Sequence, residues 1–235
     1  MYGSGPLDVS SDDSFKFRNS PSNDRIGFVR KVLSIVASQL LITAVFTFIV
    51  LASEAMTAFV QQSIEMLITT FIISMITSIA IICCKSVSRT VPYNYIALLV
   101  FTLCESYAVA AICTMYETED VLAAAVLAAC LTVTLTAYSY YCVDFEMIKF
   151  LGVSLVCIVI LMIVDLFTGF GGHPLWIALG LVIYSIYLII DIQRIMDEGR
   201  FGMTLDDYIV GAMLIYLDII MIFIKILELI GKKKN

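Results

Sequence analysis

Three acidic residues lie deep inside long apolar stretches of the sequence: Glu105, Asp191 and Asp218. An ionised carboxylate is costly in an apolar interior unless a cation, water or a hydrogen-bond donor stabilises it. Asp218 lies about ten residues into the last apolar stretch, and Glu105 lies about twelve residues into the third. These three residues are therefore the candidates for an ion pathway or for a site that binds and releases protons.

Spacing assigns the two aspartates to helix faces. Gly211, Asp218 and Lys225 recur every seven residues and so share one face of a helix. A second stripe contains Tyr184, Tyr187, Asp191 and Arg194. At about 1.5 Å per residue, Asp191 lies about 7 Å and Asp218 about 15 Å from the same edge of an apolar layer. Because segment limits carry errors of about 2–4 residues, this difference permits the two carboxylates to meet across a bundle.

The sequence also leaves structural explanations open for these acids. Asp191 can pair with Arg194, which follows one helical turn later. Asp218 can pair with Lys225, although seven residues span about 10 Å along a helix. Polar stripes such as Thr70, Ser74 and Thr77 usually mark contacts between helices and nothing more.

Seven apolar segments could position these residues. Their predicted limits are Val32–Ala52, Ile64–Cys84, Tyr93–Tyr116, Val121–Tyr141, Phe150–Phe167, Leu175–Met196 and Tyr208–Ile230. Each is roughly 18–24 residues long, the length that a helix needs to cross a bilayer. Of the 235 residues, 61% are apolar and only 14% are charged, whereas soluble domains have about 25% charged residues. The sequence therefore predicts an all-α polytopic membrane protein with seven transmembrane helices.

Loop charges predict the orientation, since Lys and Arg favour the cytosolic side. The basic residues are Lys16, Arg18, Arg25, Arg30 and Lys31 before the first segment, Lys85 and Arg89 between segments two and three, Lys149 between four and five, and Arg194 and Arg200 near the end of six. The loop at 117–120 is acidic, so the N-terminus is predicted to be cytosolic. Lys232–Lys234 break this alternation. Either the last segment crosses fully, or it is re-entrant and returns.

Composition divides the chain into three predicted parts. They are a disordered cytosolic tail (residues 1–30), a seven-helix transmembrane domain (31–231) and a basic C-terminal tail (232–235). Residues 1–25 are polar and have little apolar surface to bury. We therefore predict that deleting residues 1–25 leaves folding unchanged.

Enzyme signatures are scarce. His173 is the only histidine, so the HExxH zinc motif cannot occur. The sequence has no GxSxG nucleophile motif, no Walker A motif, and no GxGD motif around its intramembrane aspartates. We predict that the protein is not an enzyme, has no cofactor and does not bind nucleic acid.

Five stretches carry a family resemblance. They are FVRKVLSIVASQLLITA (28–44), FTLCESYAVA (101–110), MYETEDVLAAAV (115–126), DIQRIM (191–196) and LDDYIVGAMLIYLDIIMIFIKIL (205–227). Together they resemble the transmembrane Bax-inhibitor-motif family, in its lifeguard and Golgi anti-apoptotic branch, over about residues 28–231. The last stretch is the most specific, because an acidic pair and a tyrosine precede an apolar run that leads into YLDII.

The resemblance implies a seven-helix bundle with the last helix at its centre. It implies a pH-modulated calcium leak channel of the endoplasmic reticulum or Golgi that lowers store calcium and inhibits apoptosis. The family's paired aspartates correspond to Asp191 and Asp218, and its third-helix glutamate corresponds to Glu105. Bacterial relatives have an arginine in the second helix that can hold the first aspartate. Residues 64–84 contain no basic residue, so this latch is either missing or supplied by Arg194.

The same resemblance implies the ligands and partners. Calcium is expected to bind only transiently, at Asp191 and Asp218, with no metal bound permanently. The expected partners are the lipid bilayer, calcium and protons, with cell-death regulators or calcium-release channels as candidate protein partners. Two alternatives stay open: a proton-coupled transporter that uses the same acids, and a non-conducting membrane scaffold that binds cell-death regulators.

Overall fold

The computed structural model describes residues 21–141, 173–196 and 203–234 of the chain. The helices in these ranges are α2 (Pro21–Ala52), α3 (Glu54–Gln62), α4 (Ile64–Cys83), α5 (Lys85–Arg89), α6 (Tyr93–Cys113), α7 (Thr118–Tyr141), α9 (Pro174–Met196) and α10 (Tyr208–Ile230). Within the described ranges, six helices are long and apolar enough to cross a membrane: α2, α4, α6, α7, α9 and α10. The prediction of a polytopic all-α membrane protein is confirmed. The predicted segment Phe150–Phe167 lies outside the described residues.

The first helix begins earlier than the sequence predicts. It starts at Pro21, a residue type that suits the first turn of a helix because its missing N–H has no partner there. Arg25, Phe28 and Val32 are all buried against the rest of the bundle. The predicted boundary of the tail at residue 30 is therefore too late. Part of the segment assigned to a disordered tail is a packed turn of α2.

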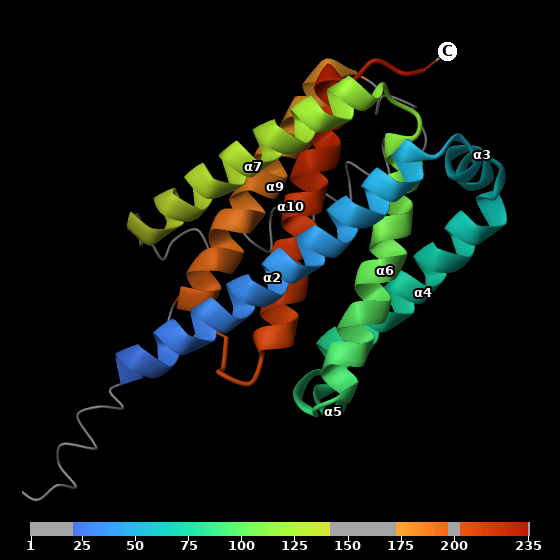
Figure 1. Cartoon of the computed structure of the whole chain (residues 1–235). Coiled ribbons are helices and arrows are strands. Elements are labelled where there is room, and N and C mark those ends of the chain that lie inside the picture. Colours follow the sequence, from blue (N-terminus) through green and yellow to red (C-terminus); the bar gives the residue numbers. More distant parts are fainter. Residues whose placement is uncertain (1–20, 142–172, 197–202, 235) are drawn as a thin grey trace, which may run out of the picture.

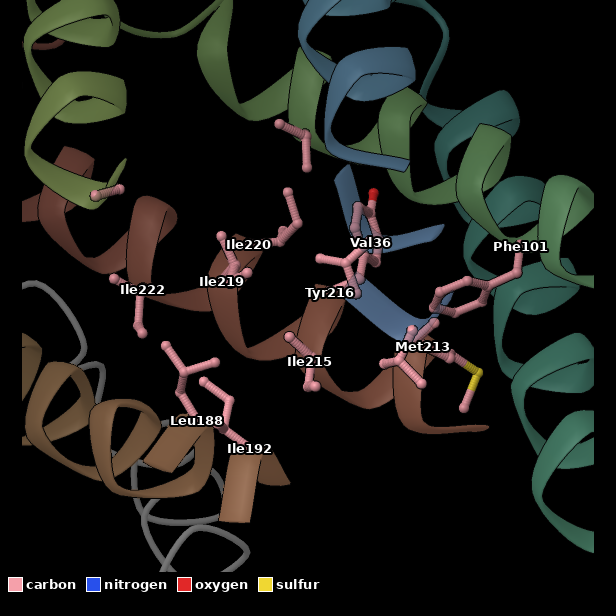
Figure 2. Close-up of a cluster of buried hydrophobic side chains, with 14 of the residues drawn as sticks. Val36, Phe101, Leu188, Ile192, Met213, Ile215, Tyr216, Ile219, Ile220 and Ile222 are labelled. Atoms are coloured by element: carbon pink, nitrogen blue, oxygen red, sulfur yellow. The ribbon is translucent and has the colours of Figure 1, made fainter. Parts of the chain in front are cut away.

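Helix α10 occupies the centre of the bundle and packs against α2, α6, α7 and α9 (Figure 1). In its most apolar stretch, 56% is buried inside the bundle, whereas the corresponding share is 11% for α4 at the periphery. Figure 2 shows its side chains reaching to both sides, with Tyr216 beside Val36 of α2 and Ile215 facing Leu188 and Ile192 of α9. The prediction that the last helix is central is therefore confirmed.

The bundle has two distinct ends. At the proximal end, where α2, α6 and α10 begin, Arg89 forms a 2.8 Å ion pair with Asp207 and Asn94 donates a 2.7 Å hydrogen bond to Tyr208. At the distal end, where these helices finish, Gln61 donates a 3.1 Å hydrogen bond to the carbonyl of Thr114. Residues 85–92 and 203–207 thus share one end, and the acidic loop at 117–120 lies at the other.

The C-terminal lysines lie at the distal end, against the acidic loop. The N–H of Lys234 donates to the carbonyl of Met115 at 2.9 Å, and the N–H of Glu117 donates to the carbonyl of Lys232 at 3.1 Å. The N–H of Lys232 also donates to the Asp120 carboxylate at 2.7 Å. Because α10 is one uninterrupted helix that ends beside this loop, the last segment crosses the bundle fully and is not re-entrant.

Candidate functional site: buried aspartates between α9 and α10

A small residue lets α9 and α10 approach closely. A Cβ atom added at Gly211 of α10 would lie 3.2 Å from Ile195 of α9 and 3.0 Å from the sulfur of Met203. Lys225, further along α10, lies over Gly180 of α9, where an added Cβ would meet its side chain at 3.3 Å. Small residues have this role in membrane bundles because dispersion contacts replace the hydrophobic effect there. The face of α10 predicted from the seven-residue spacing is thus the face that meets α9.

Asp191 lies near the proximal end of α9 and is 4% exposed. Arg194 donates a 3.0 Å hydrogen bond to it from the next turn of the same helix. The pairing that the sequence offered as one interpretation is therefore present. Arg194 is also held through its own backbone, since its carbonyl accepts hydrogen bonds from the guanidinium of Arg25 at 2.8 Å and from the N–H of Met203 at 3.1 Å.

Asp218 lies near the middle of α10 and is 8% exposed. Its carboxylate is within electrostatic range of Asp191, and Tyr184 of α9 is within range of Asp218. The Oδ2 atom of Asp218 has no hydrogen-bond partner among the described residues. The structure thus places the two predicted aspartates within electrostatic range of each other, and in the described part of the chain one buried carboxylate oxygen has no donor.

Glu105 lies on a different interface, between α6 and α4. It accepts a hydrogen bond from the hydroxyl of Ser74, a member of the polar stripe noted on the second apolar segment. Glu105 is also within electrostatic range of Tyr216, whereas Asp218 faces α9. The structure therefore does not place Glu105 in the aspartate pair.

Lys225 does not pair with Asp218. It forms a 2.6 Å ion pair with Glu228, one turn further along α10. The sequence interpretation that joined Lys225 to Asp218 is replaced by this shorter connection, since residues three apart lie side by side on a helix. In the described part of the chain, no three His, Cys, Asp or Glu side chains gather in a metal-binding group.

Sequence reasoning missed the contacts that close the proximal end beneath this site. Arg25 donates to the carbonyls of Met203 and Arg194, at 2.5 and 2.8 Å. Arg89 donates to Asp207 at 2.8 and 3.0 Å. We call Arg25, Arg89 and Asp207 the proximal clasp. Their charges are visible in the sequence, but no spacing rule connects residues more than a hundred positions apart.

The Asp207 carboxylate is stabilised in its ionised form. Burial by itself raises the pKa of Asp207, but hydrogen bonds from Thr204 and Arg89 outweigh that effect, so its pKa lies below its usual value. The Thr204 hydroxyl donates to it at 2.5 Å. This carboxylate therefore carries its charge throughout the physiological pH range and keeps the clasp closed there.

An all-α membrane bundle with a buried aspartate pair beside its central helix defines the class of this protein. Residues 25–235 match the family model described as "Inhibitor of apoptosis-promoting Bax1". The chain belongs to this family, and the resemblance inferred from sequence motifs is confirmed. Membership supports an anti-apoptotic role exercised from a membrane.

Three curated relatives are named as lifeguard proteins. The chain is 31% identical to human protein lifeguard 3 over 219 residues, which cover 88% of this chain and 68% of the relative. It is 28% identical to mouse protein lifeguard 3, covering 99% of this chain and 78% of the relative. It is 27% identical to protein LIFEGUARD 1 of Arabidopsis thaliana, covering 88% and 89%.

Proposed function

We propose that this protein is a pH-modulated calcium leak channel of intracellular membranes, which lowers store calcium and thereby restrains cell death. The observation that carries the proposal is the buried Asp218 carboxylate, which is within electrostatic range of Asp191 and has one oxygen without a hydrogen-bond donor among the described residues. Carboxylate oxygens are the ligands that calcium prefers. Such a site suits an ion that binds briefly and moves on, because one oxygen of Asp218 has no fixed donor among the described residues.

Proton exchange at the pair supplies the pH response. Two carboxylates close together in a medium of low dielectric cannot both ionise cheaply, so they exchange a proton as one unit. Arg194 stabilises the charge on Asp191 only while it stays in contact. Loss of the proton creates repulsion within the pair and a site that attracts a divalent cation. The Arg194 contact is therefore the latch in this mechanism.

Glu105 has a separate role in the proposal. It lies across α10 from the aspartate pair, at the α4–α6 interface, where Ser74 is its donor. Glu105 adds a negative charge on another interface of the bundle, and it does not take part in the proton exchange between Asp191 and Asp218. We therefore expect its neutralisation to lower flux and to leave the shape of the pH response unchanged.

The cellular setting follows from the family and from the loop charges. We place the protein in the endoplasmic reticulum or Golgi, with its proximal end in the cytosol, because that end carries Arg25, Lys85 and Arg89. The anti-apoptotic role then operates through lower store calcium. Cell-death regulators and calcium-release channels are the candidate protein partners.

Purified protein in calcium-loaded liposomes tests the proposal. A leak predicts calcium efflux down its gradient with no proton gradient imposed, and Asp24→Asn, an exposed acid in the first turn of α2, serves as the matched control for Asp218→Asn. Efflux that saturates and requires a proton gradient would favour a proton-coupled transporter instead. Cells that keep full protection with Asp218→Asn, alongside liposomes without flux, would favour the scaffold.

A further inference from the structure

A polar seam runs along the interface of α2 with α6, on the side of α10 that faces away from Asp191. It consists of Gln39, Thr43 and Thr47 on α2, Thr102 and Ser106 on α6, and Tyr216 on α10, all at most 7% exposed. Gln39 donates to Thr102 at 2.9 Å, and one turn later the hydroxyls of Thr43 and Ser106 lie 2.9 Å apart. Both contacts join residues 63 positions apart. The two helices therefore run in a fixed parallel register.

This register determines what lies at the next turn. Adding the same offset to Thr47 gives Ala110, which is fully buried and carries no polar atom. The Thr47 hydroxyl accordingly has no hydrogen-bond partner among the described residues. Where the two earlier turns place a polar group on each helix, the residue in register with Thr47 has only a methyl side chain.

Two further buried atoms in the same interface lack partners in the described part of the chain. They are the Oε1 atom of Gln39, whose residue is 3% exposed, and the hydroxyl of Tyr107, whose residue is 8% exposed. Tyr107 lies beside the same stretch of α2, with its ring centroid 6.5 Å from that of Phe46 and with Val50 in the same apolar cluster. Eight residues separate Gln39 from Thr47, so these atoms extend over about 12 Å of the helix.

The hydroxyl network in the middle of the seam has fewer hydroxyl protons than hydrogen-bond contacts. Thr43 contacts the carbonyl of Gln39 at 3.0 Å, Ser106 at 2.9 Å and Tyr216 at 2.8 Å. Ser106 also reaches the carbonyl of Thr102 at 2.6 Å. Each hydroxyl has one proton, so three protons serve four contacts. At any moment one of the four contacts has no proton between its two oxygens. An oxygen of that contact can then accept a hydrogen bond from another donor.

We propose that this seam binds water molecules, which donate to and accept from the atoms that the protein leaves unpaired. Contacts between helices explain the paired groups, but they do not explain three buried atoms in one interface that have no partner among residues 21–141, 173–196 and 203–234. A buried polar atom without a partner is costly in an apolar medium, and bound water with two to four polar neighbours removes that cost. The ligand class is water because every group on the seam is neutral. This gives α10 a hydrated face opposite the face that carries Asp218.

Radiolytic footprinting of the wild-type protein tests the proposal directly. X-ray pulses convert bound water to hydroxyl radicals, which oxidise aromatic rings within contact. After each rate is divided by the intrinsic reactivity of its ring type, we expect Tyr107 to be oxidised much faster than Phe101, a core residue of the same helix that is 1% exposed. Oxidation of Tyr107 at the rate of Phe101 would overturn the proposal.

The sign of a stability change provides an independent test. Thr47→Val keeps the shape of the side chain and removes only the hydroxyl. If water pairs with that hydroxyl, the variant unfolds at a temperature about 2–4 °C below the wild type. If the seam is dry, removal of an unpaired hydroxyl raises the unfolding temperature, and the proposal fails. Thr134→Val is the matched control, because the exposed Thr134 hydroxyl bonds only to its own helix, at Cys130.

Discussion

Replacing Arg25 with Met tests whether the proximal clasp holds the bundle together. The substitution keeps an apolar stem and removes the guanidinium, which donates to the carbonyls of Met203 and Arg194 at 2.5 and 2.8 Å. A hydrogen bond from a charged donor contributes about 1.5–3 kcal/mol. Because these carbonyls lie at the end of the bundle, where water can replace one bond in part, we expect a loss of about 2–4 kcal/mol.

That loss is large enough to measure. For a chain of this length, each kcal/mol shifts the unfolding temperature by about 2–4 °C, which gives a decrease of about 5–15 °C for Arg25→Met. Thermal unfolding in detergent, followed by size-exclusion chromatography, measures it. Arg30→Met is the control, because Arg30 is exposed on the same helix. Equal unfolding temperatures for the two variants would refute the role of the clasp.

Deletion variants separate the tail from the helix. Removing residues 1–20 should leave the unfolding temperature near that of the wild type. Removing residues 1–25 should reproduce the loss seen with Arg25→Met, which reverses the prediction made from sequence alone. If both deletions unfold at the wild-type temperature, the first turn of α2 does not contribute to stability.

The remaining predictions concern the two ends of the bundle. Gly231→Ala should detach the C-terminal tail and speed its cleavage by trypsin. The added Cβ would lie 2.5 Å from the carbonyl of Leu227 and 2.6 Å from the ring of Tyr116. Gly27→Ala is the control and should leave cleavage unchanged, because a Cβ added there meets nothing within 4 Å among the described residues. Asp207→Asn should cost about 0.5–1 kcal/mol at neutral pH, as expected for a partly exposed ion pair. Since the pKa of Asp207 is lower in the folded protein, this difference should be constant above about pH 5 and vanish as the pH falls below about 4, which acid-dependent unfolding measures. Thiol reagents that do not cross membranes should label single cysteines introduced at Val87 and Leu205 from the cytosolic side. The same reagents should label a single cysteine at Glu119 from the opposite side. Labelling of all three positions from one side would contradict the orientation.

The sequence predicted those parts of the structure that depend on local patterns. Apolar runs of bilayer length indicated the helices. The seven-residue spacing placed Gly211, Asp218 and Lys225 on one face of a helix, and in the structure Gly211 and Lys225 lie against α9. These predictions succeeded because helical periodicity and the cost of a buried charge are properties of single segments.

Contacts between distant segments could not be predicted in the same way. The polar residues near position 25 resemble a disordered tail in composition, yet Arg25 bonds to carbonyls 169 and 178 residues away. The alternation of loop charges did not predict that Lys232–Lys234 would lie at the distal end. In the structure, the acidic loop receives them through backbone hydrogen bonds and the Asp120 carboxylate. Such partners become visible only once the packing of α10 is known.

Calcium efflux from liposomes containing the two aspartate variants tests the central claim, that Asp191 and Asp218 act as one unit. Wild type, Asp191→Asn, Asp218→Asn and the double variant are compared across about pH 5–8 at matched protein amount. We expect Asp218→Asn to lose most flux together with its pH dependence, and Asp191→Asn to keep some flux with a flattened pH response. The double variant should be no worse than Asp218→Asn alone, because coupled residues are not additive. Wild-type flux and pH response in Asp218→Asn would contradict the account.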